Sequence, residues 1–310
     1  MHTRTAPIIV ALVLFLAACG TSTAPGGTSP AQPLITKDAI GTTITIPAQA
    51  PQRIISLGAT ESETLGALNL ADRVVAVDYY SNYPASIASK PKISNANAKY
   101  NIEQIIADKP DLVLGFGGET AEADRQLLQQ GINVVDVPAL DLTGSLTEIR
   151  LIGQLTHTEA TANALVAAMQ KRIDAVKAKV ASAAPVTVYM EVGYTPSPPY
   201  AFGGGSFGDA LVTLAGGKNI FGSNTTNAGF PQVSEETIIA DNPAVIILTE
   251  DPTYGGDPVA VAQRPGWGKI AAVQMHHVYA INPDLVQRPG PRMVDALDQL
   301  AKDLHPELFA

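Results

Sequence analysis

Short apolar runs alternate with helical periodicities along most of the chain. Runs of aliphatic and β-branched residues predict buried strands at 53–57, 73–77, 112–114, 132–137, 186–192, 245–248 and 278–281. Apolar residues spaced three and four apart predict helices at 61–68, 103–107, 122–130, 146–155, 209–215 and 293–304, and residues 258–270 give a mixed signal. Strands and helices that alternate through short loops predict an α/β fold with mainly parallel sheets flanked by helices.

Three local patterns refine this outline. The segment 34–46 contains two β-branched runs and predicts a hairpin. Thr60 and Glu63 have capping-box spacing, so we expect Thr60 to cap the helix at 61–68. The run Gly203-Gly204-Gly205-Ser206 has neither a P-loop lysine nor dinucleotide-fingerprint spacing, and predicts a tight turn into the next helix rather than a phosphate loop.

One helix is predicted to be much longer than the others. Residues 158–183 contain no Gly or Pro, and Pro185 follows them. At 1.5 Å per residue this stretch spans roughly 39 Å. The expected organisation is an N-terminal α/β lobe (34–145), connecting helices (146–184) and a C-terminal α/β lobe (185–310). A single long connecting helix limits the relative motion of the two lobes.

A similar segment occurs in each predicted lobe. Residues 103–114 and 236–247 both read as a short helix, an Asp-x-Pro stop and an apolar strand, and each copy begins with a glutamate. Two copies this far apart indicate two related lobes rather than a solenoid. Glu103 and Glu236 could simply favour the positive end of a helix dipole. Because they hold matching positions, we interpret them as paired acidic contacts for a two-fold partner.

The N-terminus predicts export. Arg4 precedes an apolar stretch at 8–18 that is too short to span a bilayer, as in a secretion signal. Leu16-Ala17-Ala18-Cys19-Gly20 resembles a bacterial lipobox, which implies cleavage after residue 18 and diacylation of Cys19; ordinary secretion is the alternative. The small and polar residues 19–33 predict a flexible tether. We therefore expect an extracytoplasmic protein held at the membrane by lipid.

Composition excludes some partners. The formal net charge is −9, and it becomes −10 when residues 1–18 and their one charged residue, Arg4, are removed. An acidic surface argues against nucleic acid as a partner. Cys19 is the single cysteine, so no intramolecular disulfide can form. We expect a monomer without a resident cofactor.

Aromatic residues concentrate just after the predicted strands, where open α/β sheets bind ligands. Such loop residues favour large planar or apolar ligands. We expect five of these aromatic residues and one arginine to contact ligand: Tyr80, Tyr83, Phe116, Tyr200, Phe230 and Arg288.

Nearly the whole mature chain resembles the helical-backbone class of solute-binding proteins that feed ABC importers. The resemblance rests on Arg53-Ile54-Ile55-Ser56-Leu57, Tyr80-Ser81-Asn82-Tyr83-Pro84, residues 103–114, Pro231-Gln232-Val233-Ser234 and Arg288-Pro289-Gly290-Pro291-Arg292. This class carries ferric siderophores, haem and vitamin B12. The resemblance implies capture of a bulky metal chelate between the lobes and delivery to a permease dimer with its ATPase subunits.

Within the class, the chain is most similar to vitamin B12-binding proteins. That similarity places corrin contacts at Tyr80, Asn97, Phe116, Tyr200, Phe230, Asp284 and Arg288, and transporter-docking glutamates at Glu103 and Glu236. Known B12 binders have tryptophan at the positions of Asn97, Phe116 and Phe230. A corrinoid is therefore the first expectation for the ligand, and a ferric siderophore is the second.

Other functions have weaker support in the sequence. Direct zinc or manganese binding would need clustered ligands across the cleft, but the adjacent His276 and His277 point to opposite faces of a strand. Haem is a further candidate ligand, because Tyr80 or Tyr83 could be its axial ligand. Nothing in the sequence pairs a nucleophile with a base, so catalysis is not expected. A lipoprotein that binds another protein would have no ligand-sized cleft between its lobes.

Overall fold

The N-terminal lobe is built on a four-stranded parallel sheet in the order β2-β1-β3-β4. Its strands are β1 (Ile54–Ser56), β2 (Val74–Val77), β3 (Leu112–Phe116) and β4 (Val134–Val137). Its helices are α1 (Ala59–Ala67), α2 (Ala85–Ala88), α3 (Ile102–Ala107) and α4 (Ala121–Gln129). The apolar runs that predicted these strands are almost wholly buried, as expected for a parallel sheet covered on both faces.

The C-terminal lobe repeats this plan around β5 (Val186–Gly193). Its sheet runs β6-β5-β8-β9, with β7 also paired to β5, and only β6 is antiparallel among the described strands. The other strands are β6 (Tyr200–Ala201), β7 (Gly217–Asn219), β8 (Val245–Leu248) and β9 (Val278–Ala280). The helices are α7 (Phe207–Leu214), α8 (Thr226–Gly229), α9 (Glu235–Asp241), α10 (Pro258–Val261), α11 (Ala271–Gln274) and α12 (Pro283–Gln287).

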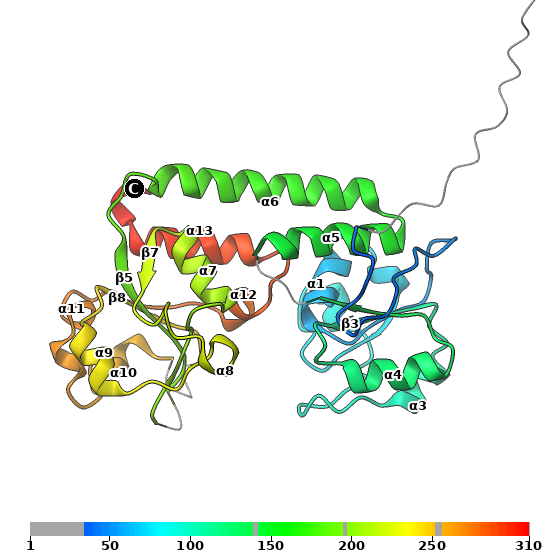
Figure 1. Ribbon diagram of the computed structural model, residues 1–310, viewed down its shortest axis with the longest axis horizontal. Coiled ribbons are helices and arrows are strands. Elements are labelled where there is room, and N and C mark those ends of the chain that lie inside the picture. Colours follow the sequence, from blue (N-terminus) through cyan, green and yellow to red (C-terminus); the bar gives the residue numbers. More distant parts are fainter. Residues whose placement is uncertain (1–33, 139–141, 195–196, 252–255, 310) are drawn as a thin grey trace, which may run out of the picture. The chain divides into compact units, whose positions relative to one another are not determined.

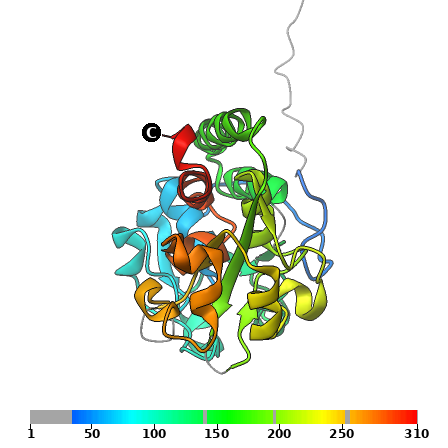
Figure 2. The ribbon, with the colours of Figure 1, turned by 90° about the vertical axis from the view of Figure 1, so that its left-hand side faces the viewer.

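Three helices connect the lobes: α5 (Leu142–Thr156), α6 (Glu159–Val180) and α13 (Met293–Leu304). Figures 1 and 2 show α13 running beside α6, and Arg172 of α6 pairs with Asp295 and Asp298 of α13 at 2.7 and 2.5 Å. Gly153 of α5 lies so close to α6 that an added Cβ would approach the Ala162 Cβ to 2.5 Å. The predicted long connecting helix is confirmed, although it spans 22 residues rather than 26.

One hydrophobic core runs through both lobes. It includes Ile54 and Leu114 from the first sheet, Val188 and Ile247 from the second, and the inner face of α6. The described residues, 34–138, 142–194, 197–251 and 256–309 of this computed structural model, belong to one compact unit. The predicted signal peptide, the tether and Cys19 lie outside them.

Two local predictions differ from the structure. The capping box at α1 is wrong, because the helix begins two residues earlier, with Gly58 as its N-cap and no side-chain cap. The hairpin at 34–46 is reduced to a single antiparallel bridge between Lys37 and Thr43. By contrast, the glycine run does turn into α7, where the Ser206 hydroxyl accepts a hydrogen bond from the Asp209 N–H.

Candidate functional site

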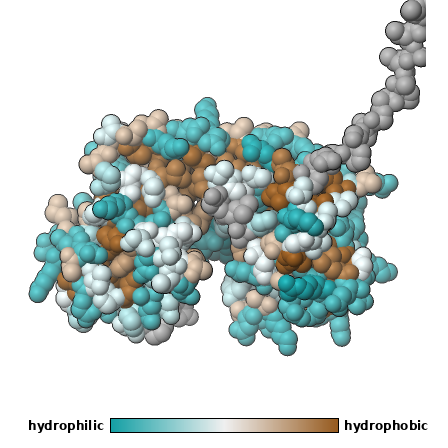
Figure 3. Space-filling view, viewed as in Figure 1, coloured by the Kyte–Doolittle hydropathy of each residue, from teal (hydrophilic) through white to brown (hydrophobic). Residues whose placement is uncertain are grey.

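The two lobes face each other across a hollow. Figure 3 shows the surface hollowed between them on the side away from α6. At the junction of the lobes, the segment after β2 meets the segment after β9, where Asn82 Nδ2 donates to Asp284 Oδ2 at 2.9 Å. Groups beyond the carboxyl ends of strands in both sheets therefore come together, as expected for a ligand site in α/β lobes.

An ion-pair network holds this junction. Arg288 donates to Glu63 Oε1 at 2.9 Å and pairs with Asp284 at 2.6 Å. Arg292 binds the same Glu63 carboxylate with two nitrogens, at 2.8 and 2.5 Å. Glu63 lies on α1 of the N-terminal lobe and is buried, while both arginines follow β9. Bidentate, charge-assisted bonds of this kind are among the stronger polar contacts in proteins, so they restrict opening at the junction.

The network engages two residues predicted to contact ligand. Arg288 also donates to Asn82 Oδ1 and to the Tyr80 carbonyl, and its side chain is only 12% exposed. Asp284 pairs with Arg288 and accepts from Asn82. In this structure both residues join the two lobes, and their contact with ligand stays a prediction.

Exposed tyrosines lie beside the network. Tyr80 and Tyr83 are 50% and 46% exposed, and Tyr79 contacts Tyr80 edge-on with ring centroids 5.2 Å apart. The Tyr80 hydroxyl donates to the Ala96 carbonyl at 2.6 Å, and the Arg292 guanidinium covers one face of the Tyr83 ring at 4.1 Å. Grouped exposed aromatic side chains are unusual on a soluble surface and mark a binding surface.

The other four predicted ligand contacts lie outside this network. Asn97 is exposed in a turn where Asn95 Oδ1 accepts from the Asn97 N–H. Phe116 is half-buried at the end of β3, and Tyr200 is half-buried in β6. Phe230 is half-buried and packs on Phe202 with centroids 5.5 Å apart. The structure therefore brings Tyr80, Tyr83, Asp284 and Arg288 together. It places the other predicted contacts, Asn97, Phe116, Tyr200 and Phe230, on separate segments.

The two predicted docking glutamates hold equivalent positions. Glu103 is the second residue of α3, which precedes β3; Glu236 is the second residue of α9, which precedes β8. Each helix has a side-chain N-cap, Asn101 accepting from the Gln104 N–H and Ser234 from the Thr237 N–H. Both glutamates are exposed, and Figure 1 shows α3 and α9 on the side away from α6. The repeat in the sequence thus corresponds to a structural equivalence.

Sequence reasoning missed Glu63, Arg292 and Tyr79 at this site. The capping-box spacing gave Glu63 a local role, whereas its partner Arg288 lies 225 residues away. Arg292 stands in the Arg-Pro-Gly-Pro-Arg segment, and that motif was the available signal for it. Tyr79 directly precedes a predicted contact, but nothing in the sequence distinguished it from a packed tyrosine.

Each lobe also contains buried acidic side chains. In the N-terminal lobe, the carboxyl groups of Glu61 and Glu148 are buried near each other, and no hydrogen bond to their oxygens is found among the described residues. Burial raises the pKa of Glu148 to about 8, and burial together with the charge of Glu148 raises the pKa of Glu61 well above its ordinary value, so the pair favours a proton. In the C-terminal lobe, Glu191 instead accepts two bonds from Arg264, at 2.7 and 2.8 Å, and one from the Tyr189 hydroxyl.

The described residues contain neither a metal-ligand cluster nor a helix able to span a membrane. No group of three or more His, Cys, Asp or Glu side chains among them could hold a metal ion. No helix in this part of the chain has the length and apolar character needed to span a membrane.

Comparison with known proteins identifies the family. Residues 54–285 match the model of the family described as periplasmic binding protein. An uncharacterized ABC transporter substrate-binding lipoprotein of Bacillus subtilis, YvrC, is 32% identical over 285 residues, which are 89% of this chain and 87% of that protein.

Solved structures agree with this assignment. The periplasmic vitamin B12-binding protein BtuF of Vibrio cholerae superposes with a TM-score of 0.70 at 27% identity, covering 83% of this chain and 97% of that one. A possible iron-binding, periplasmic solute-binding protein of Staphylococcus epidermidis gives 0.71 at 29% identity, covering 83% and 100%. The chain therefore belongs to the periplasmic binding protein family of substrate-binding proteins.

Proposed function

We propose that this substrate-binding protein is the lipid-anchored receptor of an ABC importer, and that it captures a bulky metal chelate, a corrinoid in preference, between its lobes. The observation that carries the proposal is the pair of exposed tyrosines, Tyr80 and Tyr83, at the junction of the lobes. Their rings offer stacking surface to a large planar ligand. The resemblance to vitamin B12-binding proteins supports the choice of corrinoid.

A ferric siderophore is the second candidate. Asn97, Phe116 and Phe230 stand where known B12 binders have tryptophan, so stacking area for a corrin is smaller here. A similar structure from Staphylococcus epidermidis is described as possibly iron-binding. Either ligand would be held intact by non-covalent contacts, without a catalytic step.

Calorimetric titration of the mature protein with cyanocobalamin, several ferric siderophores and haemin tests the ligand. We expect sub-micromolar binding of cyanocobalamin, and roughly tenfold weaker binding after Tyr80→Ala with Tyr83→Ala, since each aromatic contact contributes about 0.5–1.5 kcal/mol. Tyr279→Ala, a half-buried tyrosine in β9, is the control. Tight binding of a siderophore without binding of cyanocobalamin would reverse the order of the two candidates.

Glu103 and Glu236 are proposed to dock on basic residues of the two permease subunits. Reversing both charges, Glu103→Arg with Glu236→Arg, should abolish uptake of the ligand in cells and leave its dissociation constant unchanged. Glu159→Arg is a matched control, because Glu159 is also an exposed first-turn glutamate, on α6. A loss of ligand affinity in the double variant would place these residues in the cleft instead.

The lipid anchor is proposed at Cys19. Its support is the lipobox-like sequence, together with the lipoprotein name of the 32% identical Bacillus subtilis relative. Cys19→Ser should release the protein from the membrane fraction and remove metabolic labelling with fatty acid. A Cys19→Ser variant that stays membrane-bound would refute the anchor.

A further inference from the structure

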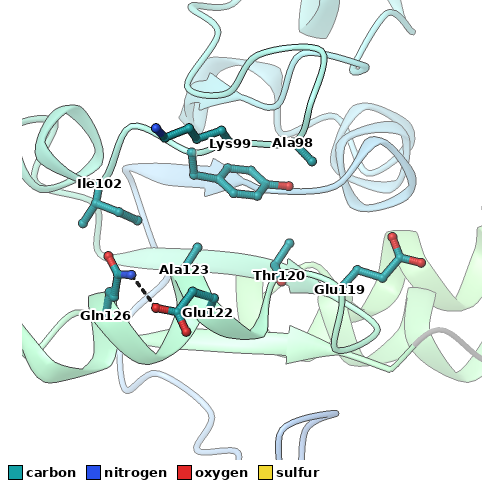
Figure 4. A pocket seen from close by; sticks show the side chains of 9 residues that line it. Ala98, Lys99, Ile102, Glu119, Thr120, Glu122, Ala123 and Gln126 are labelled. Carbon is teal, nitrogen blue, oxygen red and sulfur yellow. Dashed lines mark hydrogen bonds between the residues drawn. The ribbon is translucent and has the colours of Figure 1, made fainter.

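A crevice opens in the N-terminal lobe between the segment 98–102 and the first two turns of α4. Its volume is about 360 Å³, and Figure 4 shows the side chains of the two walls facing each other across it. It is lined by Ala98, Lys99, Tyr100, Ile102, Glu119, Thr120, Glu122, Ala123 and Gln126. None of the contacts proposed above for the ligand uses these residues.

The crevice has an apolar floor and an acidic rim. Tyr100 is fixed, because its hydroxyl donates to the Leu57 carbonyl at 2.6 Å, and Ala123 is buried below the surface. Glu119 and Glu122 are exposed at the rim, where Gln126 Nε2 donates to Glu122 Oε1 at 2.7 Å. An aliphatic stem that ends in a cation fits such a site, since the stem covers the floor and the charge meets the rim.

The crevice continues to the predicted docking residue Glu103. A neighbouring hollow of about 360 Å³ includes Glu103 and shares Lys99, Tyr100 and Ile102 with the crevice. Glu103, Glu119 and Glu122 carry three negative charges against the single positive charge of Lys99, an excess of two among the lining residues. This surface is therefore complementary to a basic partner.

The described residues of the C-terminal lobe pack differently beside its predicted docking glutamate. The segment after β8 corresponds to α4, and its Trp267 is fully buried beside the start of α9, where Nε1 donates to Glu235 at 2.8 Å. Arg264 stacks on Tyr194 and Trp267, at 3.7 and 4.5 Å from the ring centroids. The two predicted docking glutamates thus have unlike surroundings, an open crevice beside Glu103 and the buried Trp267 bonded to Glu235 beside Glu236.

We infer that the crevice receives a basic side chain, arginine in preference, from an extracytoplasmic loop of one permease subunit. This inference rests on the proposed function and extends the contact at Glu103. Arginine matches the site because its planar guanidinium pairs with carboxylates and stacks on tyrosine. Since the lobes differ, one subunit inserts this side chain and the other subunit meets Glu236 beside the buried Trp267.

Photocrosslinking in cells tests the inference without knowledge of the ligand. The full lipidated chain would carry benzoylphenylalanine at position 126, in the crevice, or at position 129, an exposed glutamine of the same helix outside it. Position 236 tests the docking proposal itself. We expect crosslinks to an ABC permease subunit from 126 and 236 and none from 129. Crosslinking from 236 alone would overturn the crevice inference, and crosslinking from neither 126 nor 236 would overturn the docking proposal as well.

Substitutions give a second, quantitative readout. Gln126→Trp, which fills the crevice, and Glu119→Gln with Glu122→Gln, which neutralises its rim, should each reduce uptake of the bound chelate roughly tenfold. Gln129→Trp should leave uptake unchanged. All variants should bind the chelate as tightly as the wild type. A change in chelate affinity instead of uptake would identify the crevice as part of the ligand site and refute the inference.

Discussion

The two lobes share a topology but bury their acidic side chains in different ways. The N-terminal lobe buries Glu61 against Glu148, an acid against an acid, so the pair is stable only while it holds a proton. The C-terminal lobe buries Glu191 against Arg264, where opposite charges compensate each other. The same backbone plan therefore supports a pH-sensitive core in one lobe and a charge-paired core in the other.

The largest loss of stability is expected from breaking the Arg264–Glu191 pair of the C-terminal lobe. Arg264→Met leaves Glu191 buried without its cation, and should lower the free energy of unfolding by about 3–5 kcal/mol in urea denaturation. Combining it with Glu191→Leu should recover much of this loss, since both charges are then removed. Arg172→Met, which breaks a half-exposed pair, is the control and should cost about 1 kcal/mol or less. If Arg172→Met lowered the free energy of unfolding as much as Arg264→Met, burial of the pair would not explain the larger loss.

The pH dependence should come mainly from the N-terminal lobe. The folded pKa of Glu148, about 8, lies above its unfolded value, so the stability it contributes is present at low pH and is lost as the pH rises through 8. Between pH 6 and 9 we expect the free energy of unfolding to fall by about 2–3 kcal/mol.

Glu148→Gln should flatten this profile between pH 6 and 8, because the amide cannot ionise and can donate to Glu61. Exposed Glu159→Gln is the control and should keep the wild-type profile. An unchanged slope in Glu148→Gln would mean that the pair does not titrate in this range.

The smallest loss of stability is expected from removing the N-caps of α3 and α9, and it should be equal in the two lobes. Asn101→Ala and Ser234→Ala each remove the side-chain cap of a helix that carries a docking glutamate, and each should cost about 1 kcal/mol of unfolding free energy. Thr225→Ala is the control, since the Thr225 side chain makes no cap hydrogen bond. Clearly unequal losses for Asn101 and Ser234 would show that the two helices are not energetically equivalent.

Elements with a strong local signal were predictable from sequence. The apolar run at β8 was assigned to the correct residues, and the Ala-rich stretch without Gly or Pro became α6. Several short elements were missed, among them α2, β7 and α12. In two further cases the reason is local: β6 has only two residues, and α8 includes Asn227 and Ala228 at positive φ, a conformation that propensity does not favour.

The candidate site was only partly predictable for a different reason. The sequence locates the loop aromatics because they follow strands, and Glu103 and Glu236 because their segment is repeated; their contacts with ligand and permease stay predictions. The junction network depends on contacts between residues more than 200 positions apart, such as Glu63 with Arg288. Local spacing carries no information about such pairs, and it suggested a nearby partner that does not exist.

The core that runs through both lobes has a consequence for how the ligand leaves. A protein whose halves share buried side chains and a common helix needs little reorganisation to accept its cargo, so nearly all of the contact free energy appears as affinity. Under the proposed function, release of such a ligand would depend on work done by the transporter. Glu103 and Glu236, exposed on the side of the lobes away from α6, are the proposed points at which it acts.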